Sequence, residues 1–504
     1  MMMMAGTLMS RVLGLVREVV VAAFFGASRG LDAFNVAYTL ANLARQLLAE
    51  GALSAAFVPV FSRALQDSRP RALSLARQAM TVLLAASAAA ALLGIWGSPL
   101  LTRIMAPGFD PEAAALAASL TRWMFPFLIL ISMAALAMGA LNSLGSFFVP
   151  ALAPAVSNLA FILTAPVFAA RLGVHGLALS VLCGGAMHFL TQWLWGFRMR
   201  APLYPVRPNL HDPDLRHMMT LFLPYAAGLS LNQVNPVVSR MLGSFLQEGS
   251  ISVLNYANRI LQLPLGLFVI AISQAVLPML SRAEGPEDFA DTLRQALRFA
   301  LFIVLPASLG LMLISGPFVH LVFVRGEFND WAWLATSSCL TFSMLGLPGM
   351  ACSTVVMRAL YALSMPRAAF NTTLFSVTAT ALLSGALMFP MGANGLALAP
   401  SIAFTLSGLL GLHYVRKKLG RPLGVPDRAW LKKTAAALAA LAVAVVLFRL
   451  ALPYRPEASL PLRGLWHLAV VALGMAAYGG ATLALRCGEW SLIREALRRK
   501  KKKA

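Results

Sequence analysis

The chain reads Leu172-Gly173-Val174-His175-Gly176-Leu177-Ala178-Leu179-Ser180, and 219 positions later it reads Met391-Gly392-Ala393-Asn394-Gly395-Leu396-Ala397-Leu398-Ala399. Three other pairs keep nearly this displacement: 58–64 with 277–283, 140–144 with 359–363, and Gly108 with Gly326. A displacement shared by four separate places is hard to obtain by chance. The sequence therefore predicts an internal duplication, with two copies of one structural unit.

The composition around this repeat is that of a membrane protein. Of the 504 residues, 59% are hydrophobic and only 12% are charged, whereas about 25% are charged in an average soluble domain. In windows of about 20 residues, the length that crosses a bilayer, we find about fourteen apolar segments. They lie at approximately 6–27, 32–58, 75–98, 117–141, 150–170, 174–195, 217–242, 250–280, 297–321, 332–355, 368–388, 393–414, 430–452 and 464–486. We predict an all-α polytopic membrane protein.

The repeat organises these segments into two lobes. Each copy holds about six segments, an even number, so both copies enter the membrane in the same direction and are related by an axis along the bilayer normal. We expect a six-helix lobe at 1–200, a cytoplasmic linker at 201–216, a second six-helix lobe at 217–418, two further helices within 428–488, and a basic tail at 489–504. Two parallel repeats around a central cavity are typical of transporters that alternate between inward-open and outward-open states.

The basic residues predict the orientation. A net charge of +22 would suggest nucleic acid in a soluble protein, but here the Lys and Arg side chains are concentrated in alternate loops, so we expect no nucleic-acid partner. The richer set of loops includes Arg63, Arg69, Arg71, Arg198, Arg200, Arg207, Arg216, Arg282, Arg294, Arg416, Lys417 and Lys418. The positive-inside rule places these loops and both termini in the cytoplasm. The first apolar segment has no recognisable cleavage site, so we expect no cleaved signal.

Charged side chains inside the predicted segments are few. Every Asp and Glu from Asp67 onward falls in a predicted loop or tail. The first two segments contain or border Arg11, Arg17, Glu18, Asp32, Arg45 and Glu50, and the eighth contains Arg259. An arginine at the bilayer centre costs about 2.5 to 3.5 kcal/mol on insertion scales, so such residues normally face a cavity or a partner.

Four of these residues also have a purely structural interpretation. Arg11 could extend its side chain to the headgroups, Asp32 could cap its own helix, and Glu18 and Glu50 could neutralise neighbouring arginines. Arg45 is different, because thirteen residues beyond Asp32 at 1.5 Å each place it about 20 Å into the membrane.

Several arginines in one cavity favour an anionic ligand. Guanidinium groups match phosphate oxygens in bidentate fashion, so we expect a phosphorylated substrate. An exporter of organic cations would need carboxylates in its cavity, and the second repeat offers none. An enzyme acting on a phosphorylated lipid would need a cluster of metal-binding carboxylates or a His/Asp set. The seven histidines and four cysteines are scattered, so we predict neither an enzyme nor a metal site.

Several short motifs are distinctive and lie mostly near the N-terminus. The motifs are Ser10-Arg11-Val12-Leu13-Gly14-Leu15-Val16-Arg17-Glu18, Phe25-Gly26-Ala27, Leu31-Asp32-Ala33-Phe34, Asn42-Leu43-Ala44-Arg45, 49–59, Ala106-Pro107-Gly108-Phe109, Tyr256-Ala257-Asn258-Arg259 and 358–363. Together they resemble the motifs of one family, the MurJ (MviN) lipid II flippases of the multidrug/oligosaccharidyl-lipid/polysaccharide (MOP) exporter superfamily. The similarity is strongest at the N-terminus and covers essentially the whole chain, weakening in the last two segments.

The resemblance implies a function and a set of site residues. A family member moves the undecaprenyl-diphosphate-linked peptidoglycan precursor, lipid II, from the cytoplasmic to the periplasmic leaflet of the bacterial inner membrane. The family's essential charges correspond to Arg11, Arg17, Asp32, Arg45 and Arg259, which we expect to bind substrate, with Glu18 and Glu50 as supporting charges. The resemblance also implies that the two last helices form a groove for the lipid tail. We expect a monomer in contact with membrane lipids.

Some positions depart from the pattern of the family. Gln46 replaces the second arginine of a pair seen in some relatives, and Asn258 replaces a frequent aspartate. Sodium-coupled relatives have carboxylates in the seventh and eleventh helices, where this chain has Asn232, Asn235 and Asn371. We therefore expect no cofactor and no sodium site of that kind, with coupling to the membrane potential or to another monovalent ion. A flippase for another polyprenyl-diphosphate oligosaccharide remains the alternative.

Overall fold

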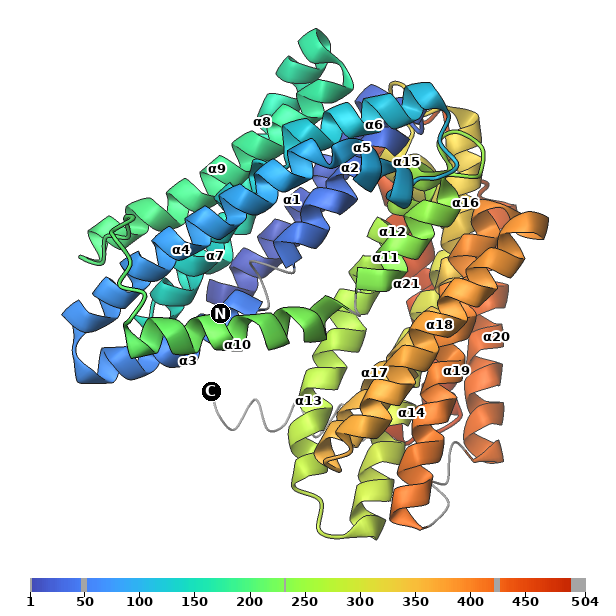
Figure 1. The fold of residues 1–504 in the computed structure, drawn as a ribbon. Helices are drawn as coiled ribbons and strands as arrows, with labels where there is room; N and C mark the ends of the chain where they lie inside the picture. The colour runs from blue at the N-terminus through green and yellow to red at the C-terminus, as the bar shows by residue number, and fades with distance from the viewer. Residues whose placement is uncertain (1, 47–51, 231–232, 421–426, 491–504) are drawn as a thin grey trace. The chain divides into compact units, whose positions relative to one another are not determined.

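The computed structural model describes every residue except 1, 47–51, 231–232, 421–426 and 491–504 (Figure 1). All regular elements in the described ranges are helices, which confirms the predicted all-α fold. Contacts divide the chain into two compact units. Unit 1 comprises Met1–Ser252 together with Arg325–Asn329, and unit 2 comprises Val253–Val324 and Asp330–Ala504.

Unit 1 is built around a pair of long adjacent helices, α8 and α9, with α1 packed along α8 and α7 packed along α9. Its helices are α1 Met2–Phe25, α2 Arg29–Arg45, α3 Ala52–Asp67, α4 Arg69–Trp96, α5 Ser98–Met105, α6 Pro111–Met124, α7 Phe127–Ser143, α8 Phe148–Leu172, α9 Val174–Arg198, α10 Pro213–Ser230 and α11 Val234–Gly243. Through contacts with α3 and α4, α10 belongs to unit 1, although the sequence assigns it to the second repeat.

Unit 2 repeats this arrangement, with α18 paired to α19 and α17 packed along α19. Its elements are α12 Ser250–Pro264, whose first three residues belong to unit 1, a π-helical turn η3 Leu265–Val269, α13 Ile270–Ser281, α14 Pro286–Leu313, α15 Ser315–Phe323, α16 Asp330–Leu345, α17 Leu347–Ala362, α18 Pro366–Met391, α19 Ala393–Leu419, α20 Arg428–Ala451 and α21 Leu460–Ala484. The helices α20 and α21 pack on each other and on α14.

The duplication is visible in backbone detail. Gly173 joins α8 to α9 at φ +56°, and Gly392 joins α18 to α19 at φ +55°. Glycine adopts this left-handed conformation without the steric cost that a Cβ brings. Three residues after each turn, a further glycine packs against the preceding helix: a Cβ on Gly176 would lie 2.3 Å from the Phe168 carbonyl carbon, and one on Gly395 would lie 2.2 Å from the Leu387 carbonyl oxygen. The repeated motif of the sequence is therefore the tight turn of a helical hairpin.

Ten described helical stretches are long and apolar enough to cross a membrane, and the count becomes eleven if α16 and α17, bent by 40° relative to each other, form one span. The other three predicted segments coincide with α1, which contains three charged residues, and with the pairs α2/α3 and α10/α11, each of which is interrupted by residues outside the described ranges. The number fourteen stays a prediction.

Candidate functional site

The buried ion pair expected on α1 is present. The Nη2 atom of Arg17 lies 2.9 Å from Oε1 of Glu18, and the two side chains are 17% and 7% exposed. Arg17 Nη1 also donates to Oδ1 of Asn158 on α8, at 3.4 Å. Asn158 in turn donates from Nδ2 to the carbonyl oxygen of Ser10, at 3.1 Å. Because these contacts come from two packed helices, the guanidinium plane of Arg17 has a defined orientation.

Aromatic rings complete the surroundings of this arginine. The guanidinium carbon of Arg17 lies 5.8 Å from the ring centroid of Tyr38 on α2 and 5.4 Å from that of Phe161 on α8. Both distances fall within the range of favourable cation–π interaction. Sequence reasoning did not find Asn158, Tyr38 or Phe161, because nothing local links these positions to Arg17.

The other three predicted arginines lie on three different helices. Arg45 is in the last turn of α2, where its Nε donates to Oδ1 of Asn42 at 2.8 Å. Arg11 lies half-buried on α1, and Arg259 lies half-buried on α12 in unit 2. Glu50 lies outside the described residues. Within the predicted set, Arg17 and Glu18 form a buried ion pair.

Asp32 is 4% exposed and accepts three hydrogen bonds from the segment that begins α12. The donors are the backbone N–H of Gly249 at 2.7 Å, the backbone N–H of Ser252 at 2.8 Å and the hydroxyl of Ser252 at 2.6 Å. Asn35 also donates to the Ser252 hydroxyl oxygen, at 3.1 Å. The first N–H groups of a helix have no partner within it, and an anionic acceptor is favoured there.

The alternative reading of Asp32, as a cap of its own helix, is wrong. Ser28 caps α2, because its Oγ accepts from the backbone N–H of Leu31 at 3.4 Å. Asp32 instead caps α12, a helix more than two hundred residues away in the sequence. Since Arg259 lies seven residues beyond Ser252, roughly 10 Å along a helix, Asp32 holds the start of the helix that carries this arginine.

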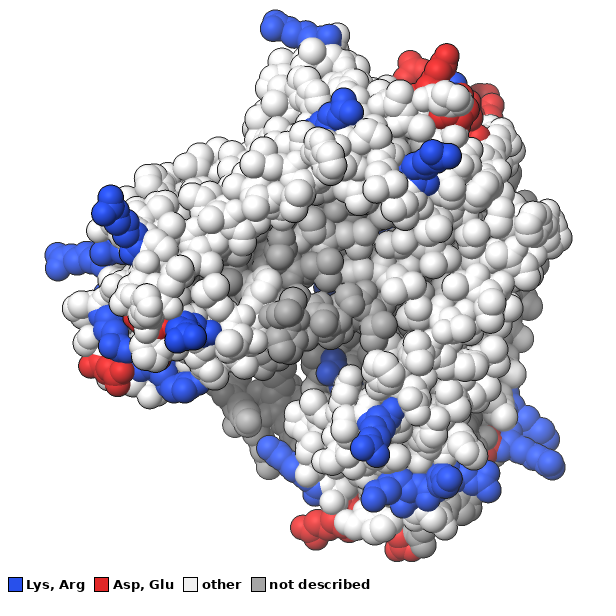
Figure 2. All heavy atoms as spheres, in the orientation of Figure 1, with Lys and Arg blue, Asp and Glu red and all other residues white. Residues whose placement is uncertain are grey.

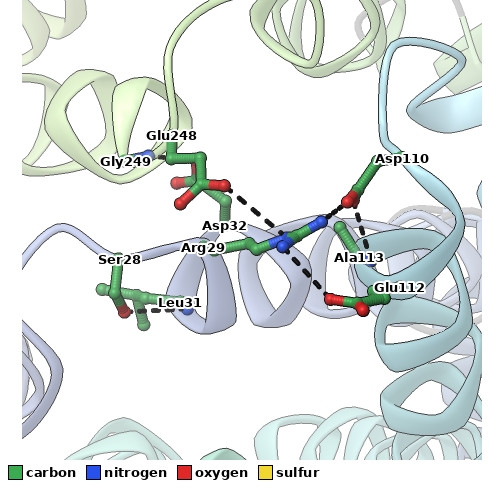
Figure 3. A network of polar contacts seen from close by, with 9 residues as sticks. All are labelled: Ser28, Arg29, Leu31, Asp32, Asp110, Glu112, Ala113, Glu248 and Gly249. Carbon is green, nitrogen blue, oxygen red and sulfur yellow. Dashed lines mark hydrogen bonds and ion pairs between the residues drawn. The ribbon is translucent and has the colours of Figure 1, made fainter.

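An acidic rim, formed by Asp110, Glu112 and Glu248, surrounds Arg29 at the first turn of α2 (Figure 3). Arg29 is ion-paired with Asp110, and its Nη1 and Nε lie 3.4 Å from Glu112 and 3.8 Å from Glu248. Asp110 also caps α6 by accepting from the N–H of Ala113 at 3.0 Å. Exposed pairs of this kind are each worth about 0 to 1 kcal/mol.

Charged side chains of unit 1 gather at its two ends. Figure 2 shows acidic side chains gathered at the upper right, where Figure 1 places the start of α6, and mainly basic side chains, with a few acidic ones, at the lower left, over the ends of α3 and α4. At the basic end, Arg71 is paired with Asp214 at 2.6 Å and Arg69 donates to the carbonyl oxygen of Met199 at 2.5 Å. These contacts join the start of α4 to the two ends of the segment between α9 and α10.

The family model for "Lipid II flippase MurJ" matches residues 21–457, most of the chain. This chain belongs to the MurJ family. The family is one of lipid flippases and not of enzymes.

Relatives named as MurJ match over most of their length. The lipid II flippase MurJ of Burkholderia cenocepacia is 32% identical over 84% of this chain and 84% of its own. The probable lipid II flippase MurJ of Bdellovibrio bacteriovorus is 32% identical over 98% of this chain and 95% of its own. The structural match to a MurJ in an inward-closed conformation has a TM-score of 0.80 and 26% identity, and it covers 96% of this chain and 98% of that chain.

The wider superfamily shares the fold. An inward-facing transporter of the multidrug resistance MATE family, within the MOP superfamily, matches with a TM-score of 0.68 at 17% identity, covering 82% of this chain and 94% of that chain. The MurJ membership and this likeness confirm the predicted MOP exporter fold. Among the described residues no group of three or more His, Cys, Asp and Glu side chains is placed to hold a metal ion.

Proposed function

We propose that this chain moves lipid II from the cytoplasmic to the periplasmic leaflet of the bacterial inner membrane by alternating access. Membership of the MurJ family supports this substrate. The observation that carries the mechanism is Arg17, held at 17% side-chain exposure by Glu18 and Asn158 inside unit 1. Because a buried arginine in a membrane protein normally faces a cavity or a partner, Arg17 is the residue beside which an anionic group of the substrate would bind.

The proposed orientation puts both termini in the cytoplasm. The basic end of unit 1, with Arg69 and Arg71, then faces the cytoplasm, and the acidic rim around Arg29 faces the periplasm. This arrangement follows the positive-inside rule. Lipid II would therefore be taken up from the side of Arg69 and Arg71 and released on the side of Arg29.

The diphosphate of lipid II would be bound by Arg17, Arg45 and Arg259, with Arg11 assisting. Guanidinium groups bind phosphate oxygens through two parallel hydrogen bonds, and this geometry requires a defined plane. The guanidinium plane of Arg17 has a defined orientation because Asn158 and Phe161, both on α8, contact it. Glu18 lowers the cost of keeping the arginine buried while the site is empty.

Asp32 would support this site without touching the diphosphate. Its two carboxylate oxygens accept from Gly249 and Ser252, and a second anion beside the diphosphate would be repelled. By capping α12, Asp32 would fix the position of Arg259 along that helix. Glu50 would act as a further supporting charge.

The lipid tail and the energy source complete the proposal. The undecaprenyl chain would stay in lipid along α20 and α21 while the headgroup crosses the cavity. A membrane potential contributes about 2.3 kcal/mol per elementary charge per 100 mV, so an inside-negative potential favours export of the anionic headgroup. Coupling would use this potential or a monovalent ion, with no cofactor, and the transporter would work as a monomer.

Complementation tests this function. A bacterial strain depleted of its own lipid II flippase is supplied with the parent chain, with R17A or with R103A, all at matched membrane levels. We expect growth with the parent and with R103A, whose arginine is exposed on α5, and lysis with R17A. Lysis with the parent despite correct insertion would refute lipid II as the substrate and favour another polyprenyl-diphosphate-linked oligosaccharide.

A further inference from the structure

Arg358 is a half-buried arginine of unit 2 that lies one turn before α17 ends at Ala362. Its Nε donates to the hydroxyl oxygen of Ser273 on α13, at 2.8 Å. Ser273 is 0% exposed, and the two helices pack against each other within unit 2. The arginine is therefore held by the interior of one compact unit.

The side chain of Arg358 extends toward the membrane interior. Two stretches long and apolar enough to cross a membrane, Ser250–Ser281 and the bent pair α16–α17, end with α13 and α17. Ser273 lies about 12 Å before the end of α13, whereas Arg358 lies about 6 Å before the end of α17. Helical side chains point toward the N-terminus of their helix, here away from the helix end. An arginine near a helix end usually extends to the headgroups instead.

The contact with Ser273 leaves the charge of Arg358 uncompensated. The hydroxyl is neutral, and within the described ranges no carboxylate is paired with this arginine. Arg298, also in unit 2, differs because its Nε lies 3.0 Å from Oε1 of Glu489. An arginine inside a membrane segment normally faces a cavity or a partner. A cation with only a neutral partner is therefore suited to an anion that enters from outside the protein.

The fold does not require a cation at this position. The repeat that aligns 140–144 with 359–363 also aligns Gly139 on α7 with Arg358. A Cβ on Gly139 would lie 3.2 Å from Cδ1 of Phe57 and 3.4 Å from Cγ2 of Val58, both on α3. In the first copy a glycine thus packs directly against apolar side chains of the neighbouring helix. Because that copy joins its two helices through glycine, the arginine of the second copy is not needed for packing.

The geometry of Arg358 matches a phosphate group. Ser273 takes only the Nε–H and fixes the guanidinium plane. The edge formed by Nη1 and Nη2 can then donate two parallel hydrogen bonds to phosphate oxygens. By the positive-inside rule the loop after α13, with Arg282, faces the cytoplasm. A lipid phosphate that enters from the cytoplasmic leaflet would meet a guanidinium at this depth early on its path.

We propose that Arg358 binds the diphosphate of the lipid substrate as it enters from the cytoplasmic leaflet, and that Ser273 is its positioning residue. The inference rests on the proposed function. It goes beyond that function by adding a phosphate-binding residue of unit 2 to the predicted arginines. Ser273 touches no substrate and acts only through the arginine.

Binding of undecaprenyl diphosphate to the full chain in detergent, measured by native mass spectrometry, tests this assignment. We expect R358A to raise the dissociation constant about tenfold, which corresponds to ~1.4 kcal/mol. R367A is the matched control, since Arg367 is exposed at the start of α18, five residues after α17 ends. It should leave the constant within about twofold. An unchanged constant in R358A, or an equal rise in R367A, would overturn the proposal.

The positioning role of Ser273 is tested in two backgrounds. We expect S273A to weaken binding about threefold in the parent chain, as the loss of one hydrogen bond does, and to have no further effect in R358A. R358K keeps the charge but lacks the planar fork, so its affinity should lie between those of the parent and R358A. Equal effects of S273A in both backgrounds would show a purely structural serine and overturn its positioning role.

A second probe separates the diphosphate from membrane phospholipid. We expect binding of phosphatidylglycerol to be unchanged in R358A. A loss as large as that for undecaprenyl diphosphate would reveal a general contact with anionic headgroups and overturn the assignment. Undecaprenyl diphosphate carries no disaccharide-pentapeptide, so its binding decides the role of Arg358 even if the parent chain does not transport lipid II. That outcome would refute only the proposed function.

Discussion

Replacing Asp32 tests how α12 is held. In D32A the backbone N–H groups of Gly249 and Ser252 lose their carboxylate acceptor, as does the hydroxyl of Ser252. A hydrogen bond to a charged group contributes about 1.5 to 3 kcal/mol. Because water and neighbouring groups recover part of three such bonds, we expect the start of α12 to lose about 3 kcal/mol against local opening.

Hydrogen exchange measures this loss directly. A local destabilisation of ~3 kcal/mol speeds exchange of the protected amides by roughly 100-fold. We expect this acceleration in peptides covering 245–260 of D32A in nanodiscs, and a smaller one in D32N, whose amide oxygen still accepts one bond. S28A is the matched control, since Ser28 caps only α2. Exchange in D32A within about twofold of the parent would refute the capping role.

Three further variants probe charges elsewhere in the chain. R17K keeps the charge but lacks the planar fork, so we expect it to fail in complementation as R17A does; full rescue by R17K would contradict the bidentate role. R29A removes exposed ion pairs and should change stability by less than about 1 kcal/mol in thermal unfolding, and a larger loss would show that the acidic rim contributes more than its exposure predicts. The carboxylate of Glu489 is 3% exposed and lies 3.0 Å from Arg298, so E489A should destabilise the protein by about 1 to 3 kcal/mol, the cost of leaving its hydrogen-bond partners unsatisfied. An unchanged melting temperature in E489A would contradict that pairing.

The repeat made the general architecture predictable. Gly173 and Gly392 mark the same hairpin turn in both copies because a left-handed turn depends on local residue type. The burial of Arg17 beside Glu18 was also predictable, since a cation and an anion adjacent in an apolar segment have few other partners.

Contacts between distant segments could not be predicted in this way. Asp32 meets Ser252 across 220 positions and Arg29 meets Glu248 across a similar span. No periodicity or motif links such residues, because tertiary packing alone brings them together. The sequence did align Gly108 with Gly326, but only the backbone distances reveal that both lie against another helix end.

The most direct test of the central claim is a translocation assay in proteoliposomes. The purified parent chain and R17A are reconstituted with fluorescent lipid II, and a membrane-impermeant quencher reports the fraction exposed at the outer surface. The account predicts that the parent chain exposes lipid II that stays protected in empty vesicles, and that R17A does not. Equal protection in vesicles with and without the parent chain would contradict it.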